Sequence, residues 1–164
     1  MKADRLTLPA GKIRTHRTSS ARPYGFPWSN VARWEPAFSR QGATHGVDPL
    51  ALACMSVIES DSTHFTEAGT VIERYDGHDA VPSVGLMQVK PWVWQYLVPA
   101  ANAYEPAGNI QLGTAVLANL IDRYGSWERA IAEGYHPGVS PNGTTPARYV
   151  EAMRGLLGEL GYAG

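Results

Sequence analysis

Glu59 is the residue of this sequence best placed for acid–base chemistry. It is the only charged residue of the stretch PLALACMSVIES, residues 49–60, which Asp48 and Pro49 open as a helix by supplying an N-cap acid and a proline at the first position. Glu59 would then lie at the helix C-terminus, where the helix dipole and apolar neighbours disfavour a carboxylate and raise its pKa. A glutamate with a raised pKa is suited to act as a general acid. A surface glutamate at a fraying helix end is the alternative.

A second unusual stretch is SVGLMQVKP, residues 83–91, which places Gln88 inside an otherwise apolar run. One interpretation is a short buried element in which the glutamine caps a neighbouring segment. The other is that the amide faces a ligand, since it supplies both a donor and an acceptor.

The elements that position these residues are mostly helices. A helix beginning at Ser29 or Asn30 would bury Val31, Trp34 and Phe38 on one face, and Gly46 would end it. Further helices are predicted from residue 49 to 60, from 91 to 97, from Asn109 as N-cap to Gly125, from Ser126 to about 133, and from Thr145-Pro146 onward. Residues 70–81 contain Asp76-Gly77 between two short β-prone runs, which predicts a hairpin. These elements indicate an α+β domain that is predominantly α.

Composition and charge limit the classes of function. The 164 residues correspond to one domain, and no apolar run is long enough to predict a membrane span. Residues 1–28 carry six basic residues and one acid, a net charge of +5, whereas residues 29–164 carry 8 basic and 14 acidic residues, a net −6. We therefore expect a solvated, poorly ordered arm over residues 1–28, followed by a folded domain over 29–164. Binding of the arm to an anionic surface is the alternative.

Four segments in order resemble one known family: VDPLALACMSVIESDS, SVGLMQVKP, NIQLGTAVLANLIDRYGSWERAIAEGYHPG and ARYVEAM. They resemble the catalytic domain of the soluble lytic transglycosylases, which belong to glycoside hydrolase family 23 and have the lysozyme-like fold. The resemblance covers roughly residues 43–157. It implies a lysozyme-like fold with one small β-hairpin and cleavage of peptidoglycan glycan strands, with 1,6-anhydromuramic ends as products.

The resemblance also assigns roles in the site. Glu59 would be the single catalytic acid and base, with Ser60 beside it as a polar helper. In the second motif, Ser83, Gly85, Met87 and Gln88 would contact the substrate: Gly85 by letting the backbone approach a sugar, Met87 as an adaptable apolar contact, and Gln88 through its amide.

Tyr135 resembles the tyrosine whose hydroxyl lies near the catalytic glutamate of this family. Two positions depart from the family pattern. His136 replaces an asparagine and adds a titratable group near the site. Thr145 replaces a glutamate that helps to bind the peptide stem in the family, so recognition of the stem is left open.

Hydrolysis by a goose-type-lysozyme-like muramidase is the competing function, and it requires a base to activate water. Glu73 and Asp76 follow Glu59 in the predicted hairpin and are the possible second acids. Asp76 also suits a turn with Gly77, whereas Glu73 lies in a strand and is expected to face inward. A non-catalytic peptidoglycan-binding or virion structural module is an alternative of another class.

The remaining expectations concern partners and location. The mechanism requires no cofactor; we expect no metal site, because His64 and His78 lack ligand spacing, and no nucleic-acid partner. Cys54 is the single cysteine, and its helical spacing with apolar residues predicts a buried core position. We expect a monomer. The basic N-terminus lacks an apolar signal segment, so the enzyme would reach the bacterial cell wall by lysis, virion delivery or specialised secretion.

Overall fold

The structure is a computed structural model that describes residues 28–77 and 80–160. In these ranges the elements, in chain order, are α1 (Trp28–His45), α2 (Pro49–Ser60), β1 (Glu73–Arg74), β2 (Ser83–Val84), α3 (Pro91–Trp94), η1 (Gln95–Leu97), α4 (Pro106–Tyr124), α5 (Trp127–Ala130), η2 (Ile131–Tyr135) and α6 (Pro146–Glu159). The predicted α+β class, predominantly α with one small sheet, is confirmed.

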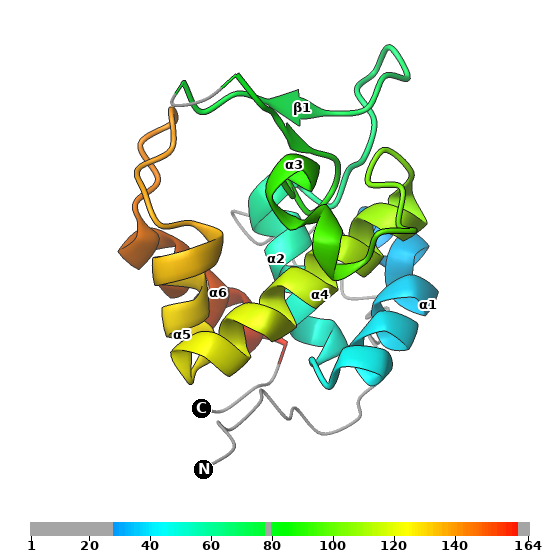
Figure 1. The fold of residues 1–164 in the computed structure, drawn as a ribbon. Coiled ribbons are helices and arrows are strands. Elements are labelled where there is room, and N and C mark those ends of the chain that lie inside the picture. Colours follow the sequence, from blue (N-terminus) through cyan, green and yellow to red (C-terminus); the bar gives the residue numbers. More distant parts are fainter. Residues whose placement is uncertain (1–27, 78–79, 161–164) are drawn as a thin grey trace.

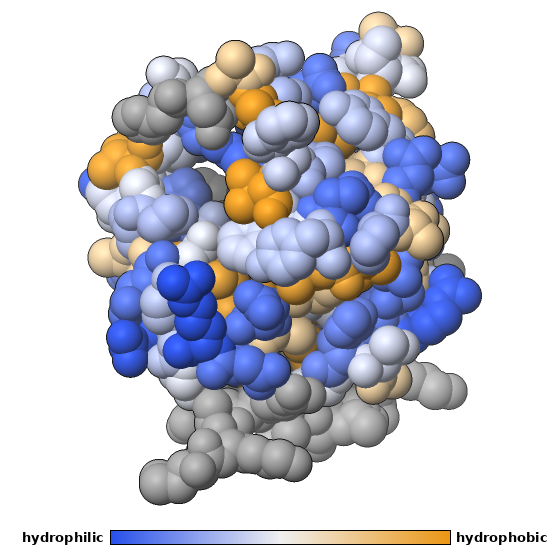
Figure 2. All heavy atoms as spheres, viewed as in Figure 1, coloured by the Kyte–Doolittle hydropathy of each residue, from blue (hydrophilic) through white to orange (hydrophobic). Residues whose placement is uncertain are grey.

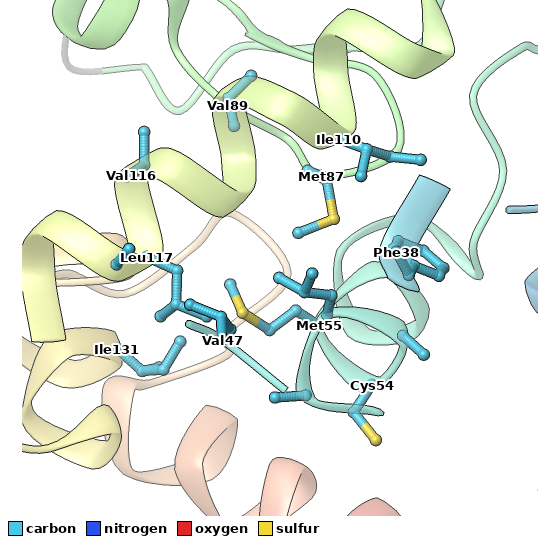
Figure 3. Packing of buried hydrophobic residues seen from close by; sticks show 14 of the residues in the cluster. Phe38, Val47, Cys54, Met55, Met87, Val89, Ile110, Val116, Leu117 and Ile131 are labelled. Carbon is cyan, nitrogen blue, oxygen red and sulfur yellow. The ribbon is translucent and has the colours of Figure 1, made fainter. Parts of the chain in front are cut away.

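Helix α4 occupies the middle of the fold (Figure 1). It contacts α1 and α3 on one side and α5 and η2 on the other, while α2 packs between α1 and α6. Figure 3 shows the core where α2 and α4 face each other, with Met55, Leu117 and Ile131 pointing toward one another. The predicted core residues Val31, Phe38 and Cys54 are buried completely.

Helix α2 begins and ends as predicted. The carboxylate of Asp48 accepts a hydrogen bond from the Leu50 N–H at 2.7 Å, and Pro49 occupies the first helical position. The helix ends at Ser60, and the next residue, Asp61, adopts a left-handed conformation with φ of 54°. Glu59 therefore lies in the last turn of a rigid helix.

The hairpin prediction needs a correction. Residues Glu73 and Arg74 pair antiparallel with Val84 and Ser83, so the second strand lies beyond the range 70–81 and Asp76-Gly77 is not a two-residue turn. Pro82 has no N–H and cannot donate to a strand partner, so pairing begins only after it. His78 and Asp79, inside this loop, lie outside the described residues.

The prediction that Asn109 caps the following helix is wrong. Helix α4 begins one turn earlier, with Glu105 as N-cap and Pro106 at the first position. Asn109 is fully buried inside the first turn, where its side chain holds another segment.

The caps of the last two helical segments are confirmed. The Ser126 hydroxyl accepts from the Arg129 N–H, and the Thr145 hydroxyl accepts from the Arg148 N–H. Between these caps the chain forms a π-helical turn, η2, which ends at Tyr135.

Most of the predicted arm, residues 1–27, lies outside the described residues. None of the helices in the part that the structure describes is long and apolar enough to cross a membrane.

Candidate active site

Glu59 lies on the wall of a cleft of about 790 Å³. The cleft runs between the 74–76 segment and α3 on one side and the segment 134–142 on the other, and Figure 2 shows this face of the molecule hollowed to the left of its centre. Ser83, Gln88, Tyr135 and His136 line the same cleft. The fold thus brings together five of the predicted site residues, from parts of the chain that are far apart in sequence.

The carboxyl group of Glu59 is partly buried and has one close side-chain partner. The Tyr149 hydroxyl of α6 donates to its Oε1 at 2.7 Å, and Arg74 donates from Nη1 to the main-chain carbonyl of Glu59. Burial raises the pKa of Glu59 to about 7, and the hydrogen bond from Tyr149 and the charge of Arg74 limit that rise. Near neutral pH the group can therefore both give and take a proton.

The two tyrosines near Glu59 stay protonated. Burial, together with the charge of Glu59, raises the pKa of Tyr135 and of Tyr149 well above that of an exposed phenol. Each hydroxyl is thus available as a donor across the range in which Glu59 titrates.

The turn that follows Glu59 is held in a strained conformation by helix α1. Asp61 and Ser62 both have positive φ, 54° and 56°, which costs free energy for residues with a Cβ. The side chains of Asn30 and Trp34 each donate to a carbonyl of this turn, at 3.0 Å to Asp61 and 3.0 Å to Ser62. Helix α1 thereby fixes the end of α2 that carries Glu59.

Residues 84–87 form a buried loop whose main chain is held by side chains from other segments. Ser60 donates to the carbonyl of Leu86 at 2.8 Å, and Tyr135 donates to the carbonyl of Met87 at 2.6 Å. His64 Nδ1 accepts from the Leu86 N–H, while its Nε2 lies 3.1 Å from the Tyr104 carbonyl, which fixes a neutral ring with the proton on Nε2. Burial lowers the pKa of His64, in keeping with that neutral state.

Asn109 makes two hydrogen bonds to this loop and one to the segment before α4. Its Oδ1 accepts from the Met87 N–H at 2.8 Å, and its Nδ2 donates at 2.8 Å to the carbonyls of both Val84 and Ala103. One buried amide therefore ties the loop to the first turn of α4 and to the segment before it.

Gln88 follows this loop and has a left-handed backbone with φ of 46°. Its Nε2 donates to the carbonyl of Gly85 at 2.7 Å, and the residue lines the cleft. The amide therefore caps its own loop, and because the residue lines the cleft, its contact with a ligand stays a prediction.

Three predicted contact residues lie elsewhere. Met87 is fully buried in the core beside Gly113, and Gly85 faces the interior, where a Cβ would come within 2.5 Å of both His64 and Asn109. Ser60 is buried and bonded to the Leu86 carbonyl. None of the three lines the cleft, so the predicted direct sugar contact by Gly85 and Met87 is wrong. Both residues instead shape the loop that precedes Gln88.

The two possible second acids differ in position. Glu73 is exposed and accepts a hydrogen bond from the Tyr104 hydroxyl, so the expectation that it faces inward is wrong. Asp76 lines the cleft and forms an ion pair of 2.6 Å with Lys90 on the same wall. Strand β1 alternates its faces, which sends Arg74 toward Glu59 and Glu73 away from it.

The His136 ring lies over Tyr149, with centroids 5.3 Å apart, and its Nε2 lies 3.1 Å from the Thr144 carbonyl. It connects the cleft wall to the loop before α6. Among the residues that the structure describes, no group of three or more histidine, cysteine, aspartate or glutamate side chains could hold a metal ion, and His78 is not among them.

Comparison with known protein families decides the classification. Residues 37–150 match the model of the family described as Transglycosylase SLT domain, which is well over half of the chain. The chain belongs to this family. The domain is also similar to a protein named Transglycosylase from Enterobacteria phage PRD1, with 30% identity over 112 residues. The match covers 68% of this chain and 37% of that protein, so the chain spans little more than a third of its relative's length.

Four residues of this transglycosylase SLT domain contact Glu59 or the loop of residues 84–87 without having been predicted to do so. The sequence predicts Asn109 as a helix cap and gives His64 no metal-ligand spacing, and it assigns no role to Tyr149 or Arg74. For Asn109 the available signal was a polar side chain next to the apolar positions of a helix, because such a group needs partners when it is buried. His64 stands in the polar stretch SDSTHFTE, which gives no such signal. No local pattern pairs Tyr149 with a glutamate that lies 90 residues earlier.

Proposed function

We propose that this domain is a peptidoglycan lytic transglycosylase that cleaves the β-1,4 bond between N-acetylmuramic acid and N-acetylglucosamine. The observation that carries the proposal is Glu59, a cleft-wall carboxyl with a pKa of about 7 and a tyrosine hydroxyl 2.7 Å from Oε1. The family match and the phage protein named Transglycosylase support the same class of activity. The cleft volume lies within the usual range for ligand pockets.

The first step breaks the glycosidic bond. Protonated Glu59 gives its proton to the bridging oxygen, and the bond from that oxygen to C1 of the muramic residue breaks. The carbonyl oxygen of the substrate's own acetamido group attacks C1 and forms a cyclic oxazolinium, which is the substrate-assisted route that needs no second carboxylate.

The second step closes the anhydro ring. Glu59, now ionised, takes the proton of the C6 hydroxyl, and that oxygen attacks C1 while the oxazolinium opens. The proton count balances, no water is consumed, and Glu59 ends as it began. Because one carboxyl must give and then take a proton, a pKa near 7 serves both steps.

The surrounding residues have supporting roles in this scheme. Tyr149 donates to the ionised form of Glu59 and stabilises it between the two steps. Gln88 and His136 line the cleft and would bind sugar hydroxyl or acetamido groups. Neither step requires a cofactor.

Hydrolysis is the second candidate, because Asp76 lines the same cleft. The Asp76 carboxylate is engaged in an ion pair with Lys90, and Glu73 is exposed and does not line the cleft. A hydrolase would need Asp76 to leave Lys90 and activate a water. These contacts favour transglycosylation.

Mass spectrometry of digested peptidoglycan tests the proposal. We expect muropeptides with anhydro ends, each lighter by one water than its reducing counterpart, and Glu73→Gln should cost little activity. Reducing ends alone, together with loss of activity in Asp76→Asn, would make the domain a muramidase.

A turbidity assay on purified peptidoglycan separates an enzyme from a non-catalytic wall-binding or virion module. We expect clearing by the wild-type domain; binding without clearing would identify the module. The similarity to a phage protein leads us to infer that the enzyme reaches the cell wall by virion delivery or host lysis; specialised secretion is the remaining route.

A further inference from the structure

Most of the exposed large hydrophobic side chains come from one stretch of the chain. Among the residues whose exposure the structure describes, they are Phe65, Tyr75, Trp92, Val93, Tyr96, Tyr104 and Val139. Six lie in the segment between α2 and α4, and the seventh lies in the loop on the opposite wall of the cleft. Three of them, Tyr75, Val93 and Val139, line the cleft, and exposed apolar surface that adjoins a cleft is typical of a ligand-binding surface.

Trp92 and Tyr96 are the most exposed of these residues, at 83% and 66%. Trp92 lies on α3 and Tyr96 on the 3-10 turn η1 that continues it, and the Tyr96 ring lies 6.4 Å from the ring of the cleft residue Trp94. A tryptophan this exposed gives up most of the free energy that its burial would contribute, so the fold itself gains little from it.

This aromatic surface, defined as Trp92, Val93 and Tyr96, is continuous with the cleft. Val93 is 45% exposed and also lines the cleft, and it lies between Trp92 and the cleft residue Trp94 along the helix. In Figure 2 the surface over α3, beside the hollow, includes orange and pale atoms. Pro91 begins this helix and fixes its first φ, which gives the aromatic surface a rigid base.

We propose that the aromatic surface binds the glycan strand where it leaves the cleft. This inference rests on the proposed function, because it takes the same polymer as its ligand. The strand is far longer than a cleft of about 790 Å³ can hold, so part of every substrate lies outside it. One face of a pyranose ring presents C–H groups, which pack against the electron-rich face of an aromatic ring. The surface would then strengthen binding to polymer without taking part in bond cleavage.

Co-sedimentation with insoluble peptidoglycan tests this binding directly. The Glu59→Gln variant serves as the parent, because it should bind without cutting. We expect adding Trp92→Ala and Tyr96→Ala to weaken its binding roughly tenfold, from the apolar area lost. Adding Trp92→Phe and Tyr96→Phe instead keeps two aromatic rings and should preserve most of the binding. Phe65→Ala is the control, because it removes an aromatic ring that is 40% exposed but does not line the cleft.

Cleavage assays in the active background separate the aromatic surface from the cleft. We expect Trp92→Ala/Tyr96→Ala to lower kcat/KM on insoluble peptidoglycan several-fold more than on short soluble muropeptide oligomers, with the difference persisting at high salt. The inference would be overturned if the double variant lowered kcat/KM by the same factor on both substrates, or if its co-sedimentation were unchanged. If the wild type cuts neither substrate, the proposed function fails, while co-sedimentation still reports on the surface.

A second copy of the chain is the competing occupant. Sedimentation velocity should show the same monomeric species for the wild type and for Trp92→Ala/Tyr96→Ala. A wild-type dimer that the two substitutions dissociate would assign the surface to self-association and overturn the inference.

Discussion

The protonation state of Glu59 is set by opposing effects within one cleft. Burial favours the neutral acid, whereas the hydroxyl of Tyr149 and the charge of Arg74 favour the carboxylate, and the balance leaves a pKa of about 7. With burial alone the pKa of Glu59 would be higher still, and the acid would give up its proton less readily in the first step of the proposed mechanism. We infer that the hydrogen bond from Tyr149 tunes Glu59 for this donation by stabilising the carboxylate that it leaves.

Removing the Tyr149 hydroxyl should therefore change the pH profile. The rate should fall as pH rises through about 7, because Glu59 loses the proton it must donate. In Tyr149→Phe the carboxylate loses a donor, the pKa of Glu59 rises further, and the falling limb should move up by roughly one pH unit. A pH–rate profile of kcat/KM measures the shift.

Tyr124→Phe is the matched control, since it removes a hydroxyl that donates to the Glu133 carbonyl outside the cleft. In this variant the falling limb of the pH–rate profile should lie at the same pH as in the wild type. A downward shift in Tyr149→Phe would contradict the assigned role of the hydrogen bond.

Glu59→Gln should remove activity while sparing stability. We expect a loss on the order of 10²–10⁴ in rate, the usual contribution of a general acid. Because the folded-state pKa is raised, ionising Glu59 costs the native state stability as pH rises from 4.5 to about 7, and glutamine does not ionise. At about pH 8 the variant should gain at most about 3 kcal/mol in unfolding free energy, and at about pH 4 the two proteins should be equal.

Thermal or urea unfolding at the two pH values measures this difference. Wild-type-like turnover in the variant would remove Glu59 from the mechanism. A variant that is less stable at the higher pH would show that the carboxylate is stabilised by the fold.

At the scale of elements, the main chain of the loop of residues 84–87 is held by hydrogen bonds from several helical segments. Ser60 of α2, Tyr135 of η2 and Asn109 of α4 each bond to its main chain, so three helical segments set its shape. Gln88, which follows the loop, has a left-handed backbone that a residue with a Cβ seldom adopts in an isolated chain. We infer that the hydrogen bonds to the loop hold it in that conformation.

Asn109→Ala should loosen the loop of residues 84–87, because it removes the side chain that bonds to its main chain. Three hydrogen bonds of a fully buried amide are lost, so we expect destabilisation of roughly 2–4 kcal/mol. We also expect kcat to fall, because Gln88 would no longer be held in place. Urea unfolding and steady-state rates measure the two effects.

A Gln88→Ala background separates positioning from stability. There, Asn109→Ala should still lower stability, but its effect on kcat should shrink, since the residue it positions is gone. Asn102→Ala, which alters an exposed asparagine that accepts from Tyr104, controls for general changes near α4. A full effect on kcat in both backgrounds would leave Asn109 with a structural role alone.

At the scale of the whole molecule, the charge is divided between residues 1–28 and the rest. The hydrophobic core is built from residues 31–157, within which the family match also falls. We predict that deleting residues 1–27 leaves the melting temperature and the cleavage of soluble glycan fragments unchanged.

If the +5 charge serves attachment to the wall, the deletion should slow cleavage of whole wall material, and the difference should shrink as salt screens the interaction. Melting temperatures and rates at low and high salt measure this. Failure of the truncated chain to fold would place the domain boundary before residue 28.

Much of the local structure could be predicted from sequence. Asp48-Pro49, Ser126 and Thr145-Pro146 specify helix starts through their own φ and capping atoms, so their signals act within four residues. The position of Glu59 in the last turn of α2 follows from the same local rules, whereas the burial that raises its pKa comes from tertiary packing. The four ordered motifs also sufficed to name the family, which the family comparison confirms.

The composition of the site was decided by tertiary structure. Whether Glu73 faces the cleft depends on how the two strands pair. Glu73 and Arg74 pair with Val84 and Ser83, which lie beyond the range in which the hairpin was expected. Whether Gly85 and Met87 meet sugar or core depends on how α4 packs against their loop. The partner of Glu59 is a tyrosine on the last helix, and a contact across 90 residues is fixed by the packing of α6 on α2, which no local propensity encodes.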